Sequence, residues 1–300
     1  MNIWALALGL VCERFLTRLL HLRELRWFDR YFDWALVRIA KFSGPSALLV
    51  TALLCAILVV PVIAIVVIFG DHLHHVPYVL FAAFVLIFSL GPRDLGREMD
   101  EYMSALESGD SEQMSRRAKE LMESDAATDA ESLPHIEKAV FVQANNRVFG
   151  VIFWFLVAGP AGGWFFRVVD LMRRRAKFES NRLRDEENET VAFLHPVRTL
   201  HGLLAWVPAR LLALGYALAG SFEDAIRNWR GFVPAERGPF YDFNDRLLAS
   251  VGCGAMGQTE TTDERAPQWH AVRSAMRLVN RTLFVWLIAI ALMTLFGQGF

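Results

Sequence analysis

The sequence predicts an all-α polytopic integral membrane protein, with four to five membrane-embedded helical segments, two of them broken or re-entrant, plus cytoplasmic helical regions. The first observation behind this prediction is composition. Of 300 residues, 54% are hydrophobic and 21% charged, and the mean hydropathy is +0.30, which is more apolar than soluble domains usually are. The second observation is patterning, because several apolar stretches approach the length that crosses a bilayer and no convincing run of strands alternates polar with apolar residues.

Charge and cysteine content exclude several classes of protein. The chain has 31 basic and 32 acidic residues, so it lacks the surplus of Lys and Arg with which proteins neutralise nucleic-acid phosphates. Its three cysteines are an odd number without CxxC spacing, which argues against a disulfide framework or a zinc site as the organising device. We therefore expect no nucleic-acid partner, no metal and no cofactor.

The N-terminal part predicts a membrane anchor followed by a transmembrane hairpin. Residues 1–12 are apolar, no basic residue precedes them and no cleavage site follows, which favours an uncleaved helix over a signal peptide. Residues 46–69 contain no charge and are long enough to span, with a kink expected at Pro61. A short polar connection leads to the apolar residues 76–90, which the Gly91-Pro92 dipeptide ends.

Two further apolar stretches are irregular. Residues 148–166 are interrupted by Gly159-Pro160 and Gly162-Gly163, so this stretch either crosses with a kink or dips into the membrane and returns. Residues 203–220 contain Pro208 and Arg210 where an ordinary span would have leucine. The last apolar stretch, residues 282–296, is just long enough to span together with the terminal residues.

The remaining residues predict polar helices outside the membrane. A helix is expected over residues 111–123 in an acidic stretch, an amphipathic helix over 135–147, and another over 221–232. The chain then divides into six regions. The first three are an N-terminal helix with a basic segment (1–45), a transmembrane hairpin (46–90) and an acidic helical region (91–147). The last three are broken membrane segments with a basic loop (148–220), an amphipathic region (221–281) and a C-terminal span (282–300).

Basic residues predict the orientation. Seven Lys and Arg precede the first clear span and none lies in the connection after it, so residues 13–45 and 91–147 are expected on the cytoplasmic side. The stretch after residue 166 is also strongly basic. If residues 148–166 crossed fully, that stretch would be outside, whereas a re-entrant hairpin at GPAGG would keep it inside; the positive-inside rule favours the hairpin.

Polar residues in or beside the apolar stretches are the candidate ligand-binding residues. Ionisable groups at membrane depth are costly and often functional, and anions favour arginine clusters. The candidates are Glu13, Arg14, Asn145, Asn146, Arg147, Asp170, His195, Arg198 and Arg210, with Glu13 or Asp170 as the expected partner of Arg210. The alternatives are interfacial charges that reach water and, for residues 145–147, a helix cap or interfacial anchor.

The order of these features resembles the AmpE family of inner-membrane proteins of β-lactamase induction. The resemblance lies in an apolar start ending in CERF, in NNRVFGVIFWFLVAGPAGG at 145–163, and above all in LAWVPARLLALGYALAGSFEDAIRNW at 204–229. It covers nearly the whole chain. It implies a membrane signalling protein that acts between cell-wall damage and β-lactamase expression, and hence in antibiotic resistance.

That family is distantly similar to the adenosylcobinamide-phosphate synthase membrane family of cobalamin biosynthesis, which uses ATP and magnesium. The synthases carry acids at the entry to the GP-containing segment and before the PAR triplet, where this chain has Asn145 to Val148 and His201-Gly202. Only Asp170, in VDLM, keeps its acid. Because magnesium–ATP sites need carboxylate ligands, this loss disfavours an enzyme.

The resemblance implies a regulator. Our hypothesis for its mechanism is that a small anionic ligand, such as a cell-wall fragment, binds near Arg210, Arg198 and Arg147 and shifts the broken segment. An ATP-dependent amide ligase or transferase, with its acids supplied by Glu13, Asp170 and residues 94–101, remains an alternative. A transporter of wall fragments is a second alternative, since broken helices and a deep arginine suit transporters. We expect membrane lipid to surround the apolar helices, and a homo-oligomer is possible as well.

Overall fold

The computed structural model describes residues 28–70, 76–90, 95–122, 136–185, 192–235, 239–257 and 267–296. These residues form helices joined by turns and include no strand, which confirms the all-α prediction. The expected N-terminal helix, with Glu13 and Arg14, lies outside the described residues. The chain divides into two compact units, the first comprising Met1–Pro92 with Gly150–Ala205 and the second comprising Arg93–Phe149 with Trp206–Phe300.

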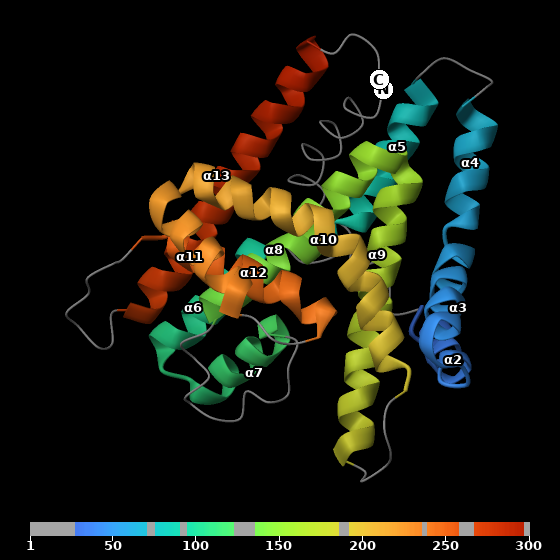
Figure 1. Cartoon of the computed structure of the whole chain (residues 1–300), viewed down its shortest axis with the longest axis horizontal. Coiled ribbons are helices and arrows are strands. Elements are labelled where there is room, and N and C mark those ends of the chain that lie inside the picture. The colour runs from blue at the N-terminus through green and yellow to red at the C-terminus, as the bar shows by residue number, and fades with distance from the viewer. Residues whose placement is uncertain are drawn as a thin grey trace. The chain divides into compact units, whose positions relative to one another are not determined.

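The first unit is built from the N-terminal hairpin and the long helix α9 (Figure 1). Its helices are α2 Asp29–Ile39, α3 Gly44–Ile57, α4 Val60–Gly70, α5 Val76–Ser89 and α9 Gly150–Asp185, followed by the first part of α10 Leu194–Ala219. Helix α9 packs against α2, α3, α4 and α5. The core between them consists of apolar side chains from α2, α3, α5, α9 and α10, among them Phe32, Ile39, Val168, Met172 and Val197.

The first transmembrane segment is bent by 47° between α3 and α4. Pro61 has no N–H to donate to the carbonyl one turn earlier, and the amides of Leu58 and Val59 instead bond three residues back, as in a 3₁₀ turn. Side chains satisfy carbonyls at this break, because Tyr31 donates to Leu54 O at 2.8 Å and Trp164 donates to Leu58 O at 3.0 Å. The expected kink is therefore confirmed and is stabilised by aromatic donors.

Helix α9 reverses direction at Gly159. Gly159 has φ +65° and ψ −159°, a conformation that essentially only glycine adopts, and Ala158 is also non-helical. A Cβ on Gly163 would lie 3.2 Å from Phe155 Cβ and 3.5 Å from Val151 O, although residues twelve apart are about 18 Å apart along a straight helix. The two arms therefore lie against each other, and the GPAGG segment forms the hairpin that the sequence favoured.

The second unit is a helical bundle around α8. Its helices are α6 Leu95–Ser108, α7 Ser111–Met122, α8 Ile136–Ala144 with the π-helical turn η4 Asn145–Phe149, the rest of α10, α11 Phe222–Ala235, α12 Phe240–Ala255 and α13 Pro267–Phe296. Helix α8 packs against α6, α7, α12 and α13. Gly252 on α12 admits the Phe141 ring, and Gly215 on α10 lets Thr282 and Trp286 of α13 approach. These close contacts bury Tyr216 and Phe149 completely.

By length and composition alone, three helical stretches in the described residues could cross a membrane: Ile136–Leu183, which is interrupted at Gly159, Leu194–Ala219 and His270–Met293. The bent pair Gly44–Ile57 and Val60–Ile68 makes a fourth candidate span, and Pro77–Ser89 is a shorter apolar helix. Helix α10 is unbroken at Pro208, where we expected irregularity. The carbonyl that Pro208 leaves without its helical partner, Leu204 O, accepts a hydrogen bond from Trp154 Nε1 at 3.0 Å, so the helix continues.

Candidate functional site

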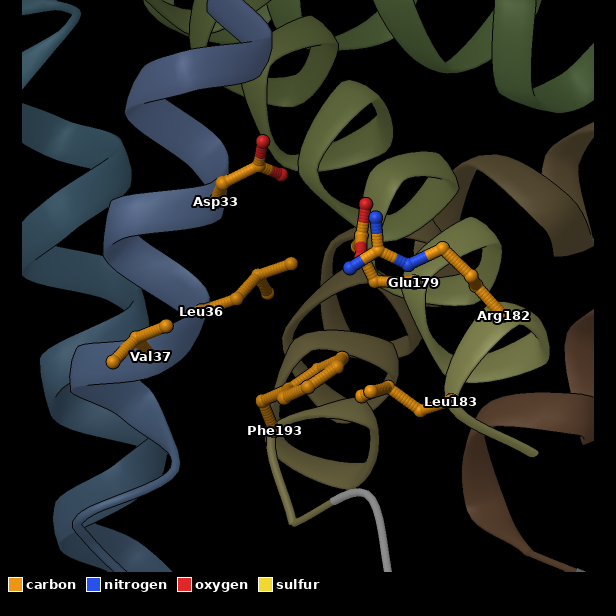
Figure 2. A pocket seen from close by; sticks show the side chains of 7 residues that line it. All are labelled: Asp33, Leu36, Val37, Glu179, Arg182, Leu183 and Phe193. Carbon is orange, nitrogen blue, oxygen red and sulfur yellow. The ribbon is translucent and has the colours of Figure 1, made fainter. Parts of the chain in front are cut away.

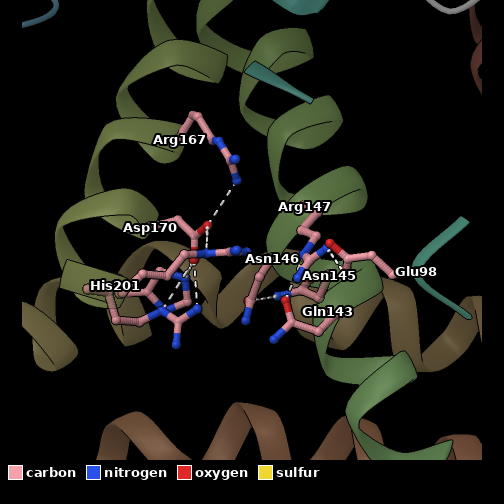
Figure 3. A network of polar contacts seen from close by, with 10 residues as sticks. Glu98, Gln143, Asn145, Asn146, Arg147, Arg167, Asp170 and His201 are labelled. Carbon is pink, nitrogen blue, oxygen red and sulfur yellow. Dashed lines mark hydrogen bonds and ion pairs between the residues drawn. The ribbon is translucent and has the colours of Figure 1, made fainter. Parts of the chain in front are cut away.

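Arg147 occupies a buried ion pair in the second unit (Figure 3). It lies in η4, its Nη1 is 2.6 Å from Glu98 Oε2 of α6, and its Nε donates to Gln143 Oε1 at 3.0 Å. Gln143 is one helical turn before Arg147 and Glu98 comes from a separate helix. Nearby on α6, burial and, to a lesser extent, the charge of Glu137 raise the pKa of Tyr102 to about 12, so this phenol stays neutral at physiological pH. The charge of Arg147 is thus neutralised by Glu98.

Asn145 and Asn146 lie beside Arg147 in the same π-turn and are fully buried. Asn145 Nδ2 donates to Asn146 Oδ1 at 3.3 Å. Among the residues that the structure describes, Asn145 Oδ1 and Asn146 Nδ2 have no hydrogen-bond partner. A π-turn with unsatisfied buried amides often marks a functional position.

Asp170 is enclosed by cations in the first unit. Its two oxygens accept hydrogen bonds from Arg167, Arg173 and Arg174 at 2.7–3.3 Å, and His201 Nε2 is 3.7 Å away. The three arginines stand three residues before and three and four residues after Asp170, so one helix supplies them all. The carboxylate is fully buried, and His201 stacks near Phe166 with 5.6 Å between ring centroids. We call Asp170 with these three arginines and His201 the Asp170 cage (Figure 3).

The Asp170 cage corrects one expectation. We expected Asp170 or Glu13 to pair with Arg210, whereas Asp170 is paired with arginines of its own helix and Glu13 lies outside the described residues. His195 and Arg198 also belong to the first unit, in the first turns of α10, where His195 is exposed and Arg198 half-buried. Within the described ranges, no three His, Cys, Asp or Glu side chains gather in a way that could hold a metal ion.

Arg210 is held by an amide and two aromatic rings in the second unit. Its Nη1 donates to Asn244 Oδ1 and to Trp206 O, both at 2.7 Å. Its guanidinium lies 4.1 Å from the Trp206 ring centroid and 5.3 Å from that of Phe243. Across the described residues, no carboxylate forms an ion pair with Arg210. The rings and the amide fix the plane of a guanidinium whose remaining N–H groups suit a carboxylate or phosphate.

Some of these partners could have been found in the sequence. Trp206 and Gln143 each precede their arginine by four residues, and helical spacing alone predicts those contacts. The arginines around Asp170 follow the same rule. Asn244, Phe243 and Glu98 come from distant helices, and nothing in the sequence points to them.

Comparison with known proteins identifies the family of this chain. The family model described as "Regulatory signalling modulator protein AmpE" matches residues 1–299. The chain belongs to the AmpE family. Protein AmpE of Shigella flexneri is 24% identical over 235 residues, covering 75% of this chain and 76% of that protein.

This chain is also similar to cobalamin biosynthesis proteins CobD. The protein of Stutzerimonas stutzeri (strain A1501) is 28% identical over 228 residues, or 69% of this chain and 70% of its own length. That of Chromobacterium violaceum is 26% identical over 225 residues, or 67% of each. No solved structure matches significantly. Both resemblances expected from the sequence are therefore confirmed.

Proposed function

We propose that this chain is an inner-membrane signalling protein of β-lactamase induction that responds to a small anionic ligand bound at Arg210. Membership of a family of regulatory signalling modulators supports the regulatory role. The single observation that carries the ligand is the environment of Arg210, a partly buried guanidinium on an apolar helix whose described partners are an amide, a backbone carbonyl and two rings. A charge at such a position is costly unless something balances it.

The proposed ligand is an anion such as a cell-wall fragment, whose carboxylate would receive two parallel hydrogen bonds from Arg210. The buried amides of Asn145 and Asn146 add a donor and an acceptor without partners in the same unit. They suit the peptide groups of such a fragment. Arg147 keeps the π-turn in place through Glu98 and Gln143 and is a positioning residue in this proposal.

The orientation that we propose puts the basic stretch after residue 166 in the cytoplasm. Two observations within the first unit support it: the chain reverses at Gly159, and Arg175 pairs with Asp33 of α2, with Nε and Oδ1 2.6 Å apart. Helix α2 directly precedes the first span, on the side that its basic residues assign to the cytoplasm.

Arg210→Ala tests this function. We expect it to abolish induction of β-lactamase by a β-lactam while the abundance of the protein in the membrane stays unchanged, because the ligand loses its charged anchor and the fold loses only partly exposed contacts. The matched control is Arg230→Ala, an exposed arginine of α11 in the same unit, which should induce normally. Hydrolysis of a chromogenic β-lactam measures induction, and an immunoblot of membranes measures the abundance of the protein. Normal induction in Arg210→Ala would refute the proposal.

An ATP-dependent ligase or transferase is the second candidate, and the likeness to CobD proteins favours it. Against it, Asp170, the acid retained in VDLM, already accepts hydrogen bonds from three arginines. Thermal stability of the purified protein with magnesium–ATP, anhydro-muropeptides or corrinoid acids separates the two, since a ligand at a hundred times its Kd adds about 2.7 kcal/mol. Stabilisation by anhydro-muropeptides that Arg210→Ala abolishes supports the sensor, and stabilisation by magnesium–ATP that Asp170→Asn abolishes supports the enzyme.

A further inference from the structure

A cavity of about 280 Å³ lies in the first unit, whereas Arg210 belongs to the second (Figure 2). It is lined by three residues of α2, three of the C-terminal end of α9 and one residue just before α10: Asp33, Leu36, Val37, Glu179, Arg182, Leu183 and Phe193. Figure 2 shows that Asp33, Glu179 and Arg182 gather at one end and that Leu183 and Phe193 lie at the other. The cavity is thus polar at one end and apolar at the other.

The polar end carries balanced charge. Arg175 bridges Asp33 and Glu179, at 2.6 Å and 2.8 Å, and Arg182 lies 3.0 Å from Glu179 Oε2. Two carboxylates therefore face two guanidinium groups. The Arg182 side chain is 58% exposed and that of Asp33 is 43% exposed, so both can still contact a ligand.

Glu179 offers a specific acceptor. Its side chain is nearly buried, and its Oε1, although close to Arg175, accepts no hydrogen bond from any of the described residues. This oxygen is ion-paired with Arg175 at 2.8 Å and still has the capacity to accept a hydrogen bond, which an ammonium group, with its three N–H donors, would supply. Balanced charge with an unused acceptor favours a zwitterion over a simple anion.

The residues around the cavity are of the kinds found at a membrane–water interface. Helix α2 ends four residues before the first span begins and exposes Trp34 and Val37, with Arg38 over the Trp34 ring at 5.0 Å. Phe178, next to Glu179, is 55% exposed. Exposed aromatic and basic side chains beside a span are typical of the membrane–water interface.

We propose that this cavity binds the head group of an aminophospholipid, phosphatidylethanolamine. The ammonium group contacts Asp33 and Glu179 Oε1, the phosphate contacts Arg182, and the acyl chains leave over Val37 along the apolar surface. A volume near the lower end of ligand sites holds the head group and excludes the chains. The site is independent of the ligand proposed at Arg210.

Native mass spectrometry of the full chain in mild detergent tests the site, with phosphatidylethanolamine, phosphatidylglycerol and phosphatidylcholine supplied in equal amounts. We expect phosphatidylethanolamine to be retained about tenfold over the other two, since one lacks the ammonium group and the other has no N–H to donate. Asp33→Asn should remove most of that preference. Val37→Trp, which alters an exposed residue at the rim and no charge, should block entry.

The control is Arg30→Gln, an exposed cation of α2 that does not line the cavity and should leave retention unchanged. Equal retention of phosphatidylethanolamine and phosphatidylglycerol, or of phosphatidylethanolamine and phosphatidylcholine, overturns the proposal. Full retention in Val37→Trp also overturns it. Displacement of the lipid by millimolar free phosphoethanolamine assigns the site to a soluble head group and overturns the lipid as its ligand.

Discussion

The two units differ in how they surround a charged side chain on a helix. In the first, Asp170 is fully buried and its own helix supplies three guanidinium groups, so the carboxylate is saturated. In the second, Arg210 is half-buried and its described side-chain partners are Asn244, Trp206 and Phe243, none of which is charged. The comparison teaches that burial of a charge alone does not indicate a ligand site, because the composition of its partners decides what else it can bind.

The difference follows from where the partners come from. Arginines three and four residues from Asp170 meet it whenever the helix forms, so the Asp170 cage is a local structure that stabilises α9. Arg210 depends on α12 for Asn244, a contact across helices that orients the guanidinium without neutralising it. We therefore infer a structural role for the Asp170 cage, in contrast to the recognition role that we propose for Arg210.

Asp170→Ala should give the largest effect. It leaves three arginines without their common carboxylate, and removing one partner of a buried ion pair typically costs about 3–5 kcal/mol. We expect poor accumulation in the membrane and a strongly lowered Tm in detergent. The control is Asp100→Ala, an exposed acid of α6, which should stay within about 0.5 kcal/mol of the wild type. A stable Asp170→Ala protein would contradict the structural role.

The next largest effects on stability are expected at two glycines in close contacts, Gly162 in α9 and Gly215 in α10, and the two should differ in size. In Gly162→Ala, the new Cβ would meet the backbone oxygen of Trp154, which cannot move without opening the hairpin, and we expect a loss of about 1–3 kcal/mol. In Gly215→Ala, it would meet the side chains of Thr282 and Trp286, at 2.7 Å and 3.1 Å, which can rotate. Tm values should therefore fall further for Gly162→Ala.

Gly231→Ala is the control for both glycine variants, since its Cβ would meet open space on α11, and alanine should stabilise that helix by up to about 1 kcal/mol. Equal destabilisation by Gly162→Ala and Gly215→Ala would mean that the reversal at Gly159 is no more rigid than an ordinary helix crossing.

The fold could be predicted where local chemistry decides it. Apolar length predicted the spans, the kink at Pro61 followed from its missing N–H, and the turn at GPAGG followed from its glycines. Pro208 misled us by the same rule, because the sequence does not reveal that Trp154 donates to the carbonyl that this proline leaves free. At Pro208 the helix continues, and Trp154 takes the place of the missing donor to Leu204 O.

The candidate site was predictable in its central residues and not in their partners. Arg210, Arg147, Asp170 and the two asparagines stood out as polar groups in apolar surroundings, a cost that the sequence displays. Whether each is satisfied depends on residues such as Asn244 and Glu98, which tertiary packing brings in from other helices. The cavity beside Asp33 likewise joins α2 to the end of α9, about 150 residues later.

Asn244→Asp should have the smallest effect on stability and the sharpest effect on function. It gives Arg210 a carboxylate at the position where Asn244 Oδ1 now lies 2.7 Å away, and so makes Arg210 resemble the Asp170 cage. A charge-assisted hydrogen bond offsets the cost of the new buried charge. We therefore expect the free energy of unfolding to change by no more than about 1 kcal/mol, with a correspondingly small shift in Tm. Induction should nevertheless fall as far as in Arg210→Ala, because the ligand must now compete with an internal anion. Asn244→Ala separates the two effects, since it leaves the guanidinium unneutralised and should keep partial induction. If Asn244→Asp instead induced fully at normal abundance, Arg210 would tolerate a permanent carboxylate partner, and its recognition role would be wrong.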